Sequence, residues 1–299
     1  MKEQVLIVNL IDWSRSFVDE DGSFYCGTTR DQKENAGKVV EHADLVIFSS
    51  DAHPVQSKEF AINSGLYPAH NVVLRSSTGP DFEYFVSAAG EAMRLGGRTM
   101  SPALTEDIGR HLRRRARGMI VPKEIYYQDG AEVPWFLPSD MERSFGTDAI
   151  GPDDFLEGDY DYIVAPKHTF DATRLESDYT LPRMVGEGIP AMNCNVFSLL
   201  RQRYPSSAFD LIFVNTGVVE GICRLHTSIG LRQMFKTSRI VNLKDATTPL
   251  AGIGLGFETP EQSRDAAMRV CKDVGVEYST TEEFLHWFNG EGKEGRGTA

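Results

Sequence analysis

The sequence lacks any closely spaced pair of cysteines. Its 299 residues include four cysteines, Cys26, Cys194, Cys223 and Cys271, and no two of them form a C-x-x-C pair. This spacing argues against both a disulfide framework and a zinc finger. Each thiol is therefore considered as a free group.

A long hydrophobic run and an excess of positive charge are also missing. The apolar stretch in the first ten residues covers about six residues, which is too short to span a bilayer, and no signal-peptide cleavage site follows it. The net charge of -12 argues against a general affinity for nucleic acid or anionic membranes, because phosphate contacts need clustered Lys and Arg. We expect a cytoplasmic protein that binds neither nucleic acid nor membranes.

What the sequence does contain is a regular alternation of strands and helices. Short apolar runs alternate with stretches of helical period, a pattern typical of an α/β fold in which helices cover both faces of a mainly parallel, doubly wound sheet. The predicted strands cover 5–11, 45–49, 162–165, 210–214 and 238–243, and the predicted helices cover 31–42, 196–204, 221–235, 260–274 and 281–288.

One long region interrupts this alternation. Residues 76–158 contain no strong buried strand but do contain several prolines, a basic run and an acidic end. A structureless loop of about 80 residues is improbable within a compact domain, so we interpret this region as an inserted lid or subdomain. The domain is expected to cover 1–288, and the tail 289–299 is expected to fray.

Polar residues follow four of the predicted strands. Asp12, Asp51, Lys167 and the turn 216–223 each come at or just after a strand end, and the carboxyl ends of parallel strands meet at one edge of a sheet. Taken singly, each signal has an ordinary structural explanation, such as a helix cap, a solvated charge or a packed thiol. Together, a carboxylate, a cation and a thiol predict a nucleophile site.

Cys223 is the best candidate for the nucleophile. It is expected in the first turn of a helix, where free N–H groups and the positive end of the helix dipole lower the pKa of a thiol and can hold an oxyanion. Cys194 is the strongest rival, although packing is its more common role.

A second group of polar residues follows the strand at 45–49. In an extended chain Asp51 and His53 project to the same side, and Glu59 and His70 would complete a set of two oxygen and two nitrogen ligands. Such a set suits Zn²⁺, Mn²⁺ or Fe²⁺. The alternative is a polar loop without a metal.

These segments resemble the isochorismatase-like hydrolase superfamily, and most closely its nicotinamidase branch. The segment from Asp12 to Phe17, D-W-S-R-S-F, stands where the family has D-x-Q-N-D-F after its first strand. Lys167 stands at the position of the family's catalytic lysine. The segment 217–223, G-V-V-E-G-I-C, resembles the G-V-A-T-D-x-C turn that contains the nucleophile.

The resemblance implies a role for each matching residue. Cys223 would be the nucleophile, Asp12 its base and Lys167 the cation that holds both. A cis peptide bond between Val218 and Val219 would point the N–H of Val219, with that of Cys223, at the oxyanion. The metal would bind at Asp51, His53, Glu59 and His70. Phe17 and Tyr67 would enclose a flat heteroaromatic ring, with Trp135 contributed by the insertion. No nucleotide cofactor is expected, because the turn lacks G-x-G-x-x-G.

The departures from the family pattern concern the substrate. Residues 14–16 differ from the family's Q-N-D, Glu220 and Gly221 replace its Thr-Asp, and the stretches 76–158 and 176–192 are surplus.

Three functions therefore stay open. The first is a metal-dependent amidase acting on a heteroaromatic carboxamide such as nicotinamide. The second is a metal-free cysteine amidase acting on a ureido compound or another amide. The third is a non-catalytic binding homologue. The cysteine disfavours a true isochorismatase, and a homo-oligomer is possible.

Overall fold

The computed structural model describes thirteen stretches of the chain. They are 2–13, 15–18, 24–51, 53–54, 57–59, 65–67, 70, 72–73, 152–158, 162–167, 169–174, 196–251 and 256–290. Most of the expected insertion 76–158, all of 176–192, the tail from 291, Cys194 and Trp135 lie outside these residues. So does the side chain of His53.

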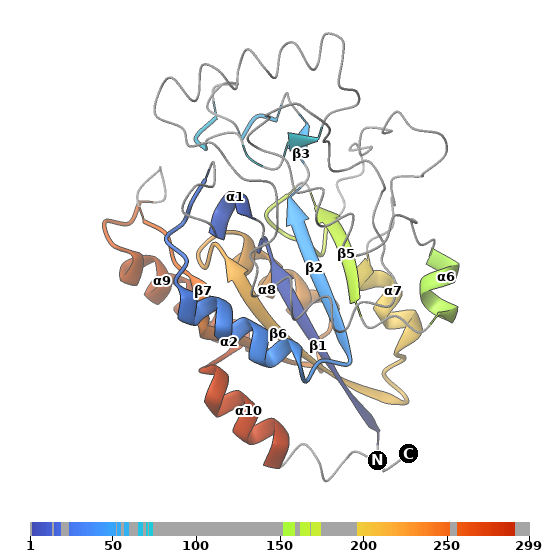
Figure 1. Cartoon of the computed structure of the whole chain (residues 1–299). Helices are drawn as coiled ribbons and strands as arrows, with labels where there is room; N and C mark the ends of the chain where they lie inside the picture. Colours follow the sequence, from blue (N-terminus) through green and yellow to red (C-terminus); the bar gives the residue numbers. More distant parts are fainter. Residues whose placement is uncertain are drawn as a thin grey trace.

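The described residues form a six-stranded, all-parallel sheet with the strand order β5-β2-β1-β6-β7-β8 (Figure 1). Its strands are β1 (Glu3–Ile11), β2 (Leu45–Asp51), β5 (Tyr162–Lys167), β6 (Phe209–Val218), β7 (Arg239–Thr248) and β8 (Glu277–Ser279). A separate two-stranded sheet pairs β3 (His53–Pro54) with β4 (Val72–Val73).

Helices lie on both faces of the large sheet. The described helices are α1 (Arg15–Val18), α2 (Arg30–Val40), α6 (Pro152–Glu157), α7 (Val196–Arg203), α8 (Cys223–Met234), α9 (Pro260–Asp273) and α10 (Thr281–Gly290), of which α6 contacts α7. In Figure 1, α2 and α10 lie in front of the sheet and α8 lies behind it, where it contacts α9. None of the described helices is long and apolar enough to cross a membrane.

The five predicted strands and five predicted helices are all confirmed, with ends that differ by a few residues. The prediction did not include β8, because its three residues are exposed or half-buried and form no apolar run. It also did not include α6, which lies at the end of the expected insertion. Phe155 of α6 is fully buried, and its carbonyl oxygen accepts a hydrogen bond from Arg203 of α7 (2.5 Å).

Buried asparagines fix the register of the central strands. Asn9 on β1 pairs with Asn215 on β6, and Asn215 pairs with Asn242 on β7. Their amides are linked by hydrogen bonds of 3.3 and 3.0 Å, and all three side chains are fully buried. A shift of one residue would leave these amides without partners in an apolar interior, so the ladder selects a single register.

That register aligns the strand ends. Asp51, the last residue of β2, pairs with Lys167, the last residue of β5. In the pair formed by strands β1 and β6, Ile11 of β1 lies opposite Gly217 of β6. The residues predicted to form the site therefore meet at the carboxyl edge of four adjacent strands.

Gly217 is required by this close approach. Its φ of +129° is unfavourable for other residues, and a Cβ at this position would overlap the carbonyl oxygen of Ile11. We expect Gly217→Ala to lower the free energy of unfolding by at least about 3 kcal/mol, measured by urea denaturation. Gly256→Ala is the control, since Gly256 also has a positive φ but has open space around it. That change should cost only about 1 kcal/mol, and equal losses would contradict the steric explanation.

Candidate active site

Lys167 connects the residues of the site. Its ammonium lies 2.8 Å from Oδ2 of Asp12 and donates to Sγ of Cys223 at 3.6 Å. It also forms a short ion pair with the carboxylate of Asp51. Asp12, Lys167 and Cys223 are 0%, 2% and 6% exposed, so these interactions take place away from bulk water and are poorly screened.

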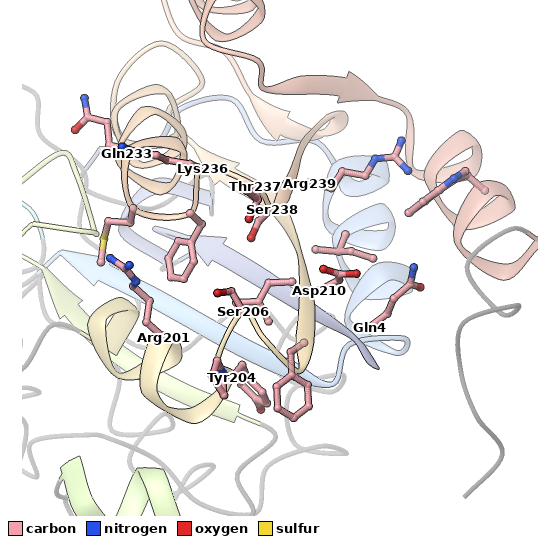
Figure 2. A pocket seen from close by; sticks show the side chains of 17 residues that line it. Gln4, Arg201, Tyr204, Ser206, Asp210, Gln233, Lys236, Thr237, Ser238 and Arg239 are labelled. Carbon is pink, nitrogen blue, oxygen red and sulfur yellow. The ribbon is translucent and has the colours of Figure 1, made fainter. Parts of the chain in front are cut away.

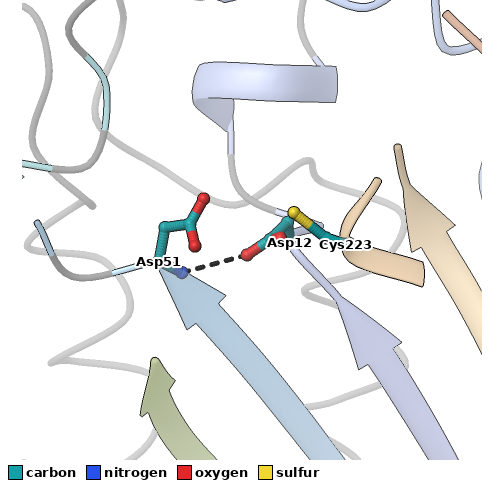
Figure 3. A group of neighbouring side chains, drawn as sticks. All are labelled: Asp12, Asp51 and Cys223. Atoms are coloured by element: carbon teal, nitrogen blue, oxygen red, sulfur yellow. Dashed lines mark hydrogen bonds between the residues drawn. The ribbon is translucent and has the colours of Figure 1, made fainter. Parts of the chain in front are cut away.

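Asp12 is held in an unusual backbone conformation. Its φ is +53°, a region that Asp enters more readily than most residues. Its N–H donates to the carbonyl oxygen of Ser49, and its Oδ1 accepts the backbone N–H of Asp51 at 2.9 Å (Figure 3). The adjacent Trp13 donates from its indole to Thr216 at 2.7 Å. These contacts leave Oδ2 of Asp12 facing Lys167.

Cys223 is the first residue of α8. The N-cap residue, Ile222, makes no side-chain capping bond, so a side chain does not compete for the N–H groups at this helix end. The peptide bond between Val218 and Val219 is cis. The positive end of the helix and the turn before it thus lie beside the thiol.

A buried charged network holds the turn that precedes Cys223. Glu220 and Arg224 are both fully buried and form an ion pair of 2.7 Å. The second oxygen of Glu220 pairs with Arg264 of α9, also at 2.7 Å. The N–H of Glu220 donates to the carbonyl oxygen of Thr248 on β7. The turn that precedes Cys223 is therefore tied to both β7 and α9.

Burial determines the protonation states at the site. Desolvation, together with the charge of Asp51, raises the pKa of Asp12 to about 7, although Lys167 opposes the shift. Burial disfavours the ammonium of Lys167, but the two carboxylates outweigh it and raise the pKa of Lys167 well above its usual value. At neutral pH the lysine is charged, and Asp12 is close to half-ionised.

The prediction of a lowered thiol pKa at Cys223 is wrong. Burial raises the pKa of Cys223 well above its ordinary value, and the carboxylates of Asp12 and Asp51 add to the rise, while Lys167 opposes it. The lysine does not compensate for the loss of solvent around the thiol. The raised pKa favours the neutral thiol of Cys223.

Two of the four expected metal ligands lie close together. Oδ2 of Asp51 is 3.6 Å from Nε2 of His70, near the separation of about 3.4 Å between two tetrahedral zinc ligands. Both side chains are buried. The carbonyl oxygen of Glu59 accepts the N–H of Tyr67, which places Glu59 in the same loop. These residues fit a transition-metal ion.

Asp12, Asp51 and Cys223 form a second grouping of metal-ligand type (Figure 3). Their ligand atoms lie within 4.8 Å of one another. Lys167, however, contacts all three residues, and its positive charge occupies the place of a cation. The lysine therefore accounts for this grouping without a metal ion.

Buried aromatic rings line the adjacent region. Phe17 and Tyr67, the two predicted ring-binding residues, are 3% and 8% exposed. Phe24 contacts both, with ring centroids at 5.7 and 5.5 Å. Phe170, which is only partly buried, contacts Tyr67 at 6.2 Å. The sequence analysis did not identify Phe24 or Phe170, because neither belongs to a periodic apolar pattern.

Figure 2 shows a different cavity, of about 860 Å³, near the start of β6 and β7 at the opposite edge of the sheet. Arg201, Lys236, Asp210 and Phe235 contribute to its lining, and its described lining residues include neither cysteine nor histidine. This cavity therefore contains none of the predicted site residues.

Comparisons with known proteins identify the fold. No family model and no curated protein match the chain. The solved structure of PnC1 from L. infantum, in complex with nicotinate, is 13% identical over 93% of this chain and 93% of that chain, with a TM-score of 0.50. A nicotinamidase/pyrazinamidase from Acinetobacter baumanii is 13% identical over 95% and 99% of the two chains (TM-score 0.49). An isochorismatase-like hydrolase from Alkaliphilus metalliredigens is 12% identical over the same shares (TM-score 0.48). The predicted three-layer, isochorismatase-like α/β fold is confirmed.

Removing the ammonium at this edge should destabilise the fold strongly. Lys167→Met leaves two buried carboxylates without their partner, and breaking a buried ion pair costs about 3–5 kcal/mol. Urea denaturation measures the loss. The control is Lys2→Met, whose pair with Asp210 spans 3.4 Å between side chains that are 44% and 60% exposed; exposed pairs contribute below about 1 kcal/mol. Similar losses for both variants would mean that Lys167 does not hold the carboxylates.

Proposed function

We propose that this protein is a cysteine amidohydrolase that cleaves a small carboxamide into an acid and ammonia through a thioester. The observation that supports this most directly is the single buried ammonium of Lys167 in contact with both Asp12 and Cys223. A thiol, a carboxylate and a cation at hydrogen-bonding range form an activated-nucleophile arrangement.

In the first step, Asp12 accepts the proton of the Cys223 thiol. A pKa of about 7 makes Asp12 a stronger base than an ordinary carboxylate while leaving a large ionised fraction at neutral pH. The sulfur attacks the amide carbon, a C–S bond forms, and the C=O electron pair moves to oxygen. The N–H groups of Val219 and Cys223 are the proposed donors to this oxyanion.

The intermediate then collapses. The C–N bond breaks, and the departing nitrogen takes the proton from Asp12, so that ammonia leaves and a thioester remains on Cys223. Asp12 is again ionised and accepts a proton from an attacking water molecule. The C–S bond breaks, the acid is released, and the thiol recovers its proton. Throughout, Lys167 keeps the carboxylate and the sulfur in register.

The proposal has two forms, and in the first the amidase requires a divalent metal ion. Asp51 and His70 would hold it together with His53 and Glu59. When bound, such an ion supplies a Lewis acid that can fix a heteroaromatic nitrogen and orient water. Nicotinamide is the first ring substrate to test, since PnC1 was solved with nicotinate.

The second form of the proposal is a metal-free amidase acting on a ureido compound or another small amide. Its support is the ion pair between Asp51 and Lys167, because this contact gives Asp51 a role in the site that needs no metal. In both forms the expected partner is a small-molecule amide, and the expected compartment is the cytoplasm.

Loss of the nucleophile should abolish activity while leaving the fold intact. Ammonia release from a panel of amides, including nicotinamide, propionamide and a ureido compound, is expected to fall at least about a thousandfold in Cys223→Ala. Cys271→Ala is the matched control, because Cys271 is also buried but lies on α9. A wild-type protein that binds these amides without releasing ammonia would instead be a binding homologue.

The metal content of the protein distinguishes the metal-dependent form of the proposal from the metal-free form. We expect about one equivalent of Zn²⁺ per chain by mass spectrometry after loading, and a loss of that ion in His70→Ala, because the variant removes half of the closest ligand pair. His42→Ala serves as the control. His42 lies between α2 and β2 in the chain, whereas His70 follows β2. Full ammonia release from a chelated, metal-free wild type would leave only the metal-free form.

A further inference from the structure

Phe24 contacts every described residue that is expected to hold a flat substrate ring. Its centroid lies 5.7 Å from that of Phe17, 5.5 Å from that of Tyr67 and 5.2 Å from that of His70. Phe17 and Tyr67 are the expected stacking partners, and His70 belongs to the expected metal site. The ring of Phe24 thus makes the contacts that a bound heteroaromatic ring would have to make.

Phe24 is also held in this position. Its side chain is 7% exposed, and its carbonyl oxygen accepts the thiol hydrogen of Cys26 at 3.2 Å. The N–H of Cys26 donates to the carbonyl oxygen of Phe17 at 2.9 Å. Two short-range bonds therefore tie the segment of Phe24 to α1, which carries Phe17.

The space around Phe24 lies beside the nucleophile. His70, which Phe24 contacts, has its Nε2 3.6 Å from Oδ2 of Asp51. Asp51 in turn pairs with Lys167, whose ammonium lies 3.6 Å from Sγ of Cys223. A ring stacked on Tyr67 with its carboxamide at Cys223 would therefore meet Phe24.

We propose that Phe24 is a specificity-determining residue that excludes flat-ring amides, so that the substrate is a carboxamide with a narrow, non-aromatic acyl or ureido group. This inference rests on the proposed amidase function and deepens it. Aromatic rings in contact have centroids about 4.5–7 Å apart, and Phe24 already meets Phe17 and Tyr67 at such distances. A second ring cannot share these contacts unless Phe24 leaves, whereas a short aliphatic chain needs less room.

Substitution of Phe24 by a smaller residue tests this assignment. The wild type is expected to have a higher kcat/KM for propionamide than for nicotinamide, measured as ammonia release. Phe24→Leu and Phe24→Ala should raise the nicotinamide-to-propionamide ratio of kcat/KM at least tenfold, since deleting methylene-sized groups from an apolar pocket changes discrimination by about 10- to 200-fold. A ratio within one variant does not depend on how much of that variant is folded.

Phe170→Leu is the matched control. Phe170 contacts Tyr67 at 6.2 Å and His226 at 5.8 Å, but no contact with Phe17 or His70 is among its described ring contacts. Its loss should leave the ratio within about twofold of the wild type. An unchanged ratio in both Phe24 variants, or a wild type that already prefers nicotinamide, would overturn the assignment of Phe24.

A second measurement keeps the assignment testable if the amidase proposal fails. Alkylation of Cys223 by iodoacetamide and by the aromatic iodoacetanilide is followed at the Cys223 peptide by mass spectrometry. Phe24→Ala should increase the rate of alkylation by iodoacetanilide at least tenfold more than the rate of alkylation by iodoacetamide. If wild type releases no ammonia from any amide and the alkylation ratio still shifts, the amidase proposal fails while Phe24 remains the residue that excludes rings. If the alkylation ratio does not shift, the assignment of Phe24 fails.

Discussion

The ammonium of Lys167 is the charge on which the candidate site depends. One buried cation contacts two carboxylates and a thiol, so the described charges at this edge are not balanced when both acids are ionised. Burial would then be costly. Partial protonation of Asp12, whose pKa rises to about 7, removes part of that excess. The same imbalance that limits stability therefore supplies a base near neutral pH.

The sheet supplies the geometry that makes this charge cluster possible. Lys167 and Asp51 end two neighbouring strands and are paired in register, and Asp12 follows the next strand, β1. The amide ladder of Asn9, Asn215 and Asn242 holds the central strands at that register. An error of one residue would turn every side chain of the shifted strand to the other face of the sheet, so the buried asparagines contribute indirectly to the placement of the charged groups.

Sequence reasoning located the chemistry but not the environment of the groups. Asp12, Lys167 and Cys223 could be predicted to meet because each follows a strand of a parallel sheet. Asp51 was placed at the same edge but only as a metal ligand. Its ion pair with Lys167 was not predicted, because it depends on β2 and β5 being neighbours, which no local pattern encodes. The direction of the Cys223 pKa was missed for a related reason. A helix start is visible in the sequence, but the degree of burial depends on segments distant along the chain. Phe24 was missed because it lies in an irregular segment.

Two departures from the family pattern now have a structural explanation. Glu220 contacts Arg224 and Arg264 rather than Lys167, so its charge is used to fasten the turn. At Gly221, a Cβ would lie 2.7 Å from Oγ of Ser263 on α9, so the buried Ser263 side chain would have to shift. Gly221 therefore leaves room for the Ser263 hydroxyl beside the turn, while the Glu220 carboxylate holds α9 through Arg264. Both residues support the turn that precedes Cys223, so neither of these two departures alters the aromatic residues around Phe24.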